Sequence, residues 1–180
     1  LPMPTQPGPD AAYYLLGCEH LAAGQWVWGG EPPLAFLVLY PFTRVLSGPK
    51  AFTVCSALFG GLAVYLMGEL CARLAVRTWA GPQSRRQPAA VLGALIGAVL
   101  CLGYMYPWFM TGLLKNQVAN VLVIGVLLAL TTGNLLRSGL FLLLAASAHP
   151  GVALTLAVAL VATAGLTLAG RVLAASRNGH

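Results

Sequence analysis

Residues that could act as acids, bases or metal ligands are few in this chain and lie mostly at its start. All four acidic residues fall within the first 69 positions, and three of them, Asp10, Glu19 and Glu31, lie in the first 50. A carboxylate is costly to place in hydrocarbon, so a membrane chain keeps few of them, usually at functional positions. Such groups can take a proton from a hydroxyl or hold a divalent metal ion. We therefore expect the chemistry to lie in the first 50 residues.

Two later residues could join these acids. Lys115 follows one long apolar run and His149 follows a shorter one. A lysine or histidine at the edge of a membrane can meet a phosphate group. Structural roles are also open to both: Lys115 could snorkel at a helix end, and His149, before Pro150, could cap a helix.

The acids have structural interpretations as well. Asp10 suits the N-cap of a helix, and Glu19 with His20 could form the wet face of a helix at the membrane surface. Glu31, before two prolines, could simply belong to a loop. The fourth acid, Glu69, lies four residues before Arg73, which predicts an ion pair on one helix face.

Composition indicates which elements must position these residues. The chain is 58% hydrophobic and 8% charged, with a mean hydropathy of +0.80, whereas soluble domains are about 25% charged. We predict an all-α fold, a multi-pass transmembrane helical bundle in the lipid bilayer. The net charge of +6 is then topological, since no basic stripe with interleaved aromatics indicates nucleic acid. The four cysteines show neither metal-ligand spacing nor a disulfide pattern.

Residues 1–50 are predicted to form a polar head. Residues 11–23 favour a helix that Asp10 precedes and Gly24 ends. Tyr13, Leu16 and His20 fall on one side of it, so the segment is amphipathic. Residues 34–46 are apolar but short of the roughly 20 residues of a crossing, so we expect a second interfacial helix there.

Residues 51–180 are predicted to form a bundle of about five helices. Spans are expected over 51–76, 89–110, 118–136 and 151–172, with a short apolar run over 140–148. We expect loops at 77–88 and 112–117, and a turn marked by Arg137 and Gly139. The adjacent Gly60 and Gly61 favour close helix packing. The first residues lack the pattern of a signal peptide, and the chain is interpreted as part of a longer one.

The positive charges predict an orientation. If the basic 77–88 connector is cytoplasmic, Arg137 and the arginines after residue 170 fall on the same side. The head, Lys115 and His149 then share the opposite side, as the positive-inside rule requires. We expect the cytoplasmic (inner) membrane, with the 1–50 head extracytoplasmic. The count of crossings also predicts a helix before Leu1.

The head resembles the first extracytoplasmic loop of the GT-C class of integral-membrane glycosyltransferases, which use polyprenyl-phosphate sugars. The resemblance lies in an acid followed by aromatics, then two interfacial helices, then a Pro-Pro-Leu element, and it extends to the order of the later helices. It covers the amino-terminal half of a typical member. The matching segments are Gly8-Pro9-Asp10-Ala11-Ala12-Tyr13-Tyr14, Glu19-His20-Leu21-Ala22-Ala23-Gly24 and Glu31-Pro32-Pro33-Leu34.

The resemblance implies a site and a reaction. Asp10 would be the catalytic carboxylate, and the ligand of a divalent metal in a metal-dependent member. Tyr13, Glu31, Lys115 and His149 would bind the lipid-linked sugar. The acceptor oxygen would attack the anomeric carbon with inversion as the polyprenyl phosphate leaves.

Two departures from the family and two other functions stay in view. The loop over 112–117 has no acid where many members carry one, and Glu31 stands where some relatives have lysine. One alternative is a non-catalytic multi-pass subunit that packs against other membrane subunits. Another is a transporter-like bundle, which would predict polar or broken positions within the spans, and these spans have few.

Overall fold

The chain is a set of helices that the computed structural model describes over residues 9–25, 34–78, 83–111 and 114–178. Within these ranges it forms helices and no strand, which confirms the all-α prediction. In chain order, the helices are α1 (Pro9–Ala22), α2 (Leu34–Thr43), α3 (Gly48–Thr78), α4 (Gln83–Thr111), α5 (Leu114–Thr131), α6 (Leu135–Ala148) and α7 (Pro150–Asn178).

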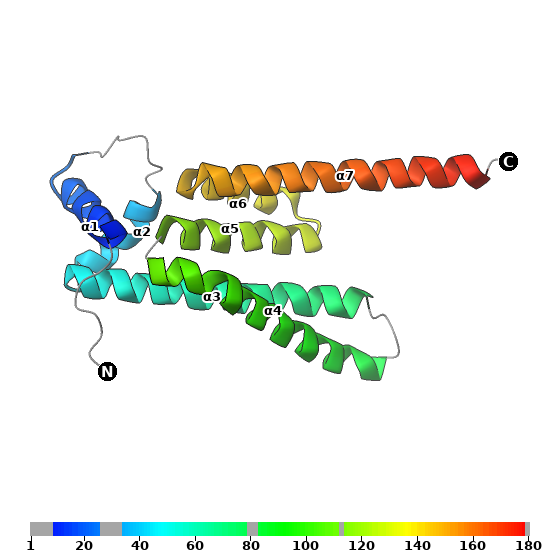
Figure 1. The fold of residues 1–180 in the computed structure, drawn as a ribbon, viewed down its shortest axis with the longest axis horizontal. Coiled ribbons are helices and arrows are strands. Elements are labelled where there is room, and N and C mark those ends of the chain that lie inside the picture. The colour runs from blue at the N-terminus through cyan, green and yellow to red at the C-terminus, as the bar shows by residue number, and fades with distance from the viewer. Residues whose placement is uncertain (1–8, 26–33, 79–82, 112–113, 179–180) are drawn as a thin grey trace.

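Helices α3 to α7 run up and down between two ends, and α1 and α2 lie together at one of them (Figure 1). We call this the head end, where α3, α5 and α7 begin and α4 and α6 finish. A single core joins these parts, since buried residues of α1 and α2 pack with the starts of α3 and α5 and with Ala148 of α6. We call the opposite end the arginine end. Its described arginines are Arg73, Arg77, Arg85, Arg86 and Arg137.

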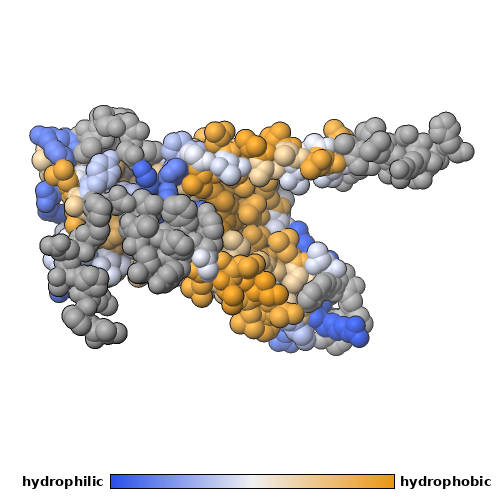
Figure 2. Space-filling model, viewed as in Figure 1, coloured by the Kyte–Doolittle hydropathy of each residue, from blue (hydrophilic) through white to orange (hydrophobic). Residues whose placement is uncertain are grey.

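Four of the described helices are long and apolar enough to cross a membrane, judged by length and composition. They cover Gly48–Thr78, Arg85–Gly103, Leu114–Thr131 and Pro150–Leu168. Two shorter apolar helices, α2 and α6, accompany them. Figure 2 shows apolar surface along the middle of the molecule, with hydrophilic residues toward both ends. This distribution is the one that a bilayer-embedded surface needs, because lipid tails solvate the apolar band and water the ends.

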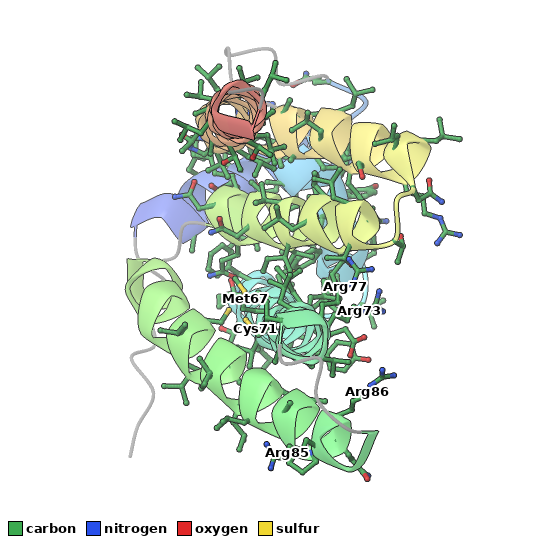
Figure 3. All side chains as sticks on the ribbon, turned by 90° about the vertical axis from the view of Figure 1, so that its right-hand side faces the viewer. Met67, Cys71, Arg73, Arg77, Arg85 and Arg86 are labelled. Atoms are coloured by element: carbon green, nitrogen blue, oxygen red, sulfur yellow. The ribbon has the colours of Figure 1, made fainter. Side chains whose placement is uncertain are left out.

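Small residues let α3 and α4 approach closely. A Cβ on Gly93 would lie 2.6 Å from the Cys71 carbonyl oxygen, and one on Gly97 would lie 2.7 Å from that of Met67. Gly93 and Gly97 are one turn apart, so they form the small-xxx-small face that brings helix backbones together (Figure 3).

The expected packing role of Gly60 and Gly61 is wrong within this chain. A Cβ on either would meet nothing within 4 Å. These glycines lie on a side of α3 that faces away from its neighbours, which spacing along the sequence does not reveal.

The boundary between α5 and α6 differs from the prediction of a span to residue 136 and a turn at Arg137 and Gly139. Helix α5 ends at Thr131, and both of those residues lie inside α6. Gly133 takes the left-handed conformation with φ of 72°, which glycine adopts at little cost. Asn134 then caps α6, since its side chain accepts a hydrogen bond of 3.0 Å from the Arg137 amide.

The first helix is confirmed with a shifted start. Helix α1 begins at Pro9, where proline suits a first turn, so Asp10 lies inside the helix rather than before it. At the other end Gly24 has φ of 72°, and the Gln25 amide donates to the His20 carbonyl over 2.9 Å, as expected of a glycine stop. The predicted short helix after the two prolines is α2.

Candidate functional site

The head is a packed unit in which α2 crosses α1 at a glycine. A Cβ on Gly17 would lie 2.4 Å from the Phe36 ring, so only glycine leaves room for this ring. The same ring lies 5.5 Å from that of Tyr13 and 5.6 Å from that of Tyr14, between ring centroids. Aromatic pairs at this separation stabilise the contact beyond their buried area. The head is therefore held in one arrangement that can position side chains.

Tyr14 joins the head to the bundle. Its side chain is 2% exposed, and its ring stacks on that of Phe52 at the start of α3 with centroids 6.0 Å apart. Its hydroxyl accepts a hydrogen bond of 3.3 Å from the backbone amide of Lys115. The first amides of a helix have no partner inside the helix, so the phenol satisfies one of them. This contact brings α1 against the start of α5, although the two residues are 101 positions apart in the chain.

The predicted loop over residues 112–117 is wrong at its second half, because α5 begins at Leu114. Lys115 therefore lies on the first turn of a helix and is half-buried. The residues after it are more deeply placed: Asn116 is 7% exposed and Gln117 is 0% exposed.

Two buried amides of this turn are functional candidates that the sequence reasoning missed. The Asn116 Oδ1 and both polar atoms of the Gln117 side chain have no hydrogen-bond partner. A buried amide without a partner costs about 1–3 kcal/mol, so native proteins rarely keep one without a reason. The signal was present as a polar Lys-Asn-Gln triplet at the head of an apolar run, but it was interpreted as a loop.

His149 lies between α6 and α7 at the head end, directly after Ala148 of the head-end core. Its backbone amide donates to the Ala145 carbonyl over 2.8 Å, and its Nδ1 accepts from the Val152 amide over 3.3 Å. Capping by His149 is thus confirmed, and it serves both helices. Since Nδ1 accepts a hydrogen bond, the proton of a neutral ring resides on Nε2, which faces outward as a donor.

The five residues predicted to form the site have different outcomes. Lys115 and His149 come to the same end of the bundle as Tyr13, which is 40% exposed on α1. The backbone of Asp10 lies one turn before Tyr14 on α1, while its side chain is outside the described part of the chain. Glu31 lies outside the described residues altogether.

A cavity of about 370 Å³ opens within the head between α1, α2 and the start of α3. Glu19 and Arg44 both line it, and the Arg44 guanidinium lies 5.9 Å from the centre of the Tyr40 ring, a cation–π distance. Cys18 lines it too, and its Sγ donates weakly to the Phe36 carbonyl over 3.7 Å. Burial, followed by the nearby Glu19 charge, raises the pKa of the Cys18 thiol to about 11. This cysteine is therefore a buried thiol rather than a nucleophile.

At the arginine end, Glu69 forms the predicted ion pair. Arg73 Nε donates to Glu69 Oε1 over 2.7 Å, and both side chains are partly exposed. Glu69 thus lies at the end of the bundle opposite the head acids. An exposed pair of this kind contributes little to stability, roughly 0–1 kcal/mol.

Metal binding and family membership were both compared with what is known. Over the described residues, no group of three or more His, Cys, Asp or Glu side chains could hold a metal ion. The predicted ligand, Asp10, has its side chain outside that description, and no step is derived through a metal. Neither protein-family models, nor curated proteins, nor solved structures match this chain. The similarity to the GT-C class therefore rests on the sequence motifs of the head.

Proposed function

We propose that this chain is a membrane glycosyltransferase of the GT-C type, or the amino-terminal half of one. It transfers a sugar from a polyprenyl-phosphate donor to an acceptor on the extracytoplasmic side of the membrane. The resemblance of the head motifs supports the class of enzyme. The helices long enough to cross a bilayer support a membrane-bound, lipid-linked donor.

The observation that carries the proposal is the bond between the Tyr14 hydroxyl and the Lys115 amide. It ties the helix that bears Asp10 to the turn that bears Lys115. His149 lies at this end as well, beside the same core. Acid, cation and imidazole thus share one end of the bundle, which is the arrangement that a phosphate leaving group and an acceptor hydroxyl require.

In the proposed mechanism Asp10 takes the proton of the acceptor hydroxyl, or orients that hydroxyl. The acceptor oxygen forms a bond to the anomeric carbon while the bond from this carbon to the phosphate oxygen breaks, and the polyprenyl phosphate leaves with the electron pair. Lys115 stabilises the negative charge that develops on the phosphate. Tyr13, Glu31 and His149 bind the sugar and the headgroup.

The test replaces Asp10 with asparagine in the full-length protein and measures transfer from a radiolabelled polyprenyl-phosphate sugar. Loss of a general base lowers turnover by about 10²–10⁴-fold. Glu19→Gln is the matched control, because Glu19 is an exposed acid on the same helix and has no role in the proposed step. Equal turnover by wild type and Asp10→Asn would remove Asp10 from the mechanism.

The orientation has its own test. A cysteine at Gln83, at the start of α4, is expected to react with an impermeant maleimide only from the cytoplasmic side. Labelling from outside would invert the topology and place the head in the cytoplasm.

A second candidate function is a non-catalytic subunit of a larger membrane complex. One observation favours it: only 6% of the most apolar stretch of α7, within Pro150–Leu168, is buried inside the chain. A span with so little internal packing has a face to offer another subunit. A purified protein that transfers no sugar by itself, yet stays bound to a stoichiometric membrane partner, would favour this function over the first.

A further inference from the structure

A second cavity lies at the arginine end, far from the head. It has a volume of about 360 Å³ and opens between α3, α4 and the end of α5. The volume is many times the about 30 Å³ that a water molecule occupies in the liquid. Its lining combines charged, hydroxyl and apolar groups: Glu69, Ala72, Arg73, Val76, Arg77, Ala90, Thr131 and Thr132.

The polar part of this lining is positively charged. Arg73 bonds to Glu69 through Nε, and Arg77 donates one terminal nitrogen to the Thr131 carbonyl at the end of α5. Each guanidinium has five N–H donors in a planar fork, so both keep donors for an anion. The two threonine hydroxyls donate to backbone carbonyls of their own helix instead. Recognition of a ligand in this cavity therefore falls to the arginines.

A third arginine lies beside the first two. Arg86 comes one turn before Ala90, which lines the cavity. Figure 3 shows the side chains of Arg73, Arg77 and Arg86 on the same side of the α3–α4 pair, with Arg85 directed away from them. With Glu69 as the one acid of the chain outside the head, three positive charges face one negative charge here.

The surroundings of the cavity are apolar. Ala72, Val76 and Ala90 form its walls, and the three helices around it are candidate membrane spans. A soluble anion gains nothing from apolar walls, whereas a lipid places its headgroup against the cations and its chains along the helices. Basic pockets between membrane helices bind anionic lipid headgroups in this way.

We propose that this cavity binds the phosphate headgroup of an anionic phospholipid in the leaflet at the arginine end. Arg77 and Arg86 contact the phosphate, with Arg73 held in place by Glu69. The acyl chains lie along the apolar surfaces of α3 and α4. The proposal requires the chain to be embedded in a membrane but does not depend on sugar transfer, since Asp10 and Lys115 lie at the other end.

The test titrates phosphatidylglycerol into the full-length protein in detergent and counts bound lipids by native mass spectrometry. Arg86→Gln is expected to weaken binding about fivefold, and Arg77→Gln with Arg86→Gln about 25-fold, since each arginine near a membrane surface contributes about 1 kcal/mol. Arg85→Gln is the matched control: it removes the same charge from the adjacent position and should leave the affinity unchanged. Phosphatidylcholine should bind no better to wild type than to the double variant.

Two further arms guard the interpretation. Arg77→Gln also removes the bond to Thr131, so Arg77→Lys tests charge alone and should retain most of the binding. Inorganic phosphate should not displace the lipid. Equal losses in Arg85→Gln and Arg86→Gln, or displacement by inorganic phosphate, would overturn the proposal, the first in favour of diffuse surface charge and the second in favour of a soluble-phosphate site.

Discussion

Replacing Gly93 with alanine should force α3 and α4 apart. The new Cβ would lie 2.6 Å from the Cys71 carbonyl oxygen and 2.8 Å from the Ala75 Cβ. Ordinary van der Waals contact starts at 3.4 Å, so the shortfall from 2.6 Å is 0.8 Å along that line. The nearest atom belongs to the backbone of a helix, so no rotamer change can relieve the contact.

The magnitude follows from two opposing terms. Overpacking of a close contact costs about 1–3 kcal/mol. Alanine in place of glycine within a helix gains about 0.5–1 kcal/mol because it restricts the unfolded chain. Gly103→Ala, on the same helix, receives only the second term, since a Cβ there would meet nothing within 4 Å. The two variants should therefore differ in free energy of unfolding by about 1–3 kcal/mol, which is the packing term alone.

The assay is unfolding in mixed micelles with a rising fraction of SDS, followed by far-ultraviolet circular dichroism. Gly93→Ala should unfold at a lower SDS fraction than wild type, and Gly103→Ala at the same or a higher one. Adding Ala75→Gly to Gly93→Ala should restore little, because the carbonyl of Cys71 remains in the way. Equal unfolding free energies for the two alanine variants would refute the close approach of these helices.

Three other outcomes are expected. Tyr14→Phe should lower the free energy of unfolding by about 1 kcal/mol, because the Lys115 amide loses its partner; an unchanged value in the same SDS titration would contradict the link between head and bundle. Asn134→Ala should cost about 1 kcal/mol through loss of the α6 cap, whereas Asn134→Asp, which keeps the acceptor, should cost less. In a variant with Cys18 as its one cysteine, burial and the Glu19 charge hold the pKa near 11, against 9.0 for a free thiol. Alkylation of this thiol at pH 8 should run about 100-fold slower than in the unfolded chain and rise with pH through about 11, and a rate that levels off near pH 9 would refute the shift.

The helical content was predictable from residue types because each long apolar run has one stable conformation in lipid, the helix that satisfies its own backbone. Helix ends depended on local chemistry. Gly24 was recognised as a stop, while Gly133 and Asn134 were missed because the apolar pattern continues past them to Leu136. The polar residues Lys115 and Gln117 were read as loop because polarity in a membrane chain suggests water, but here they begin a helix that the head covers.

The candidate site was predicted in its members but not in its arrangement. Lys115 and His149 were assigned to one membrane side by the parity of crossings, and they lie at one end of the described helices. No pattern in the sequence indicates that the Tyr14 hydroxyl would bind the Lys115 amide or that Gln117 would be buried without a partner. Both depend on how α1 lies across the start of α5.

Taken by themselves, the residues determined the all-helical class, the membrane-spanning lengths and the division of charge between two ends. Each of these follows from local hydropathy and from the cost of exposing backbone or charge to lipid. The tertiary structure alone decided which glycines bring helices together, since Gly93 meets a neighbour and Gly60 does not. It also decided that Arg73 and Arg77 would border a cavity with the end of α5. Such contacts join residues far apart in the chain, and their energy depends on the relative rotation of packed helices, which local preferences leave open.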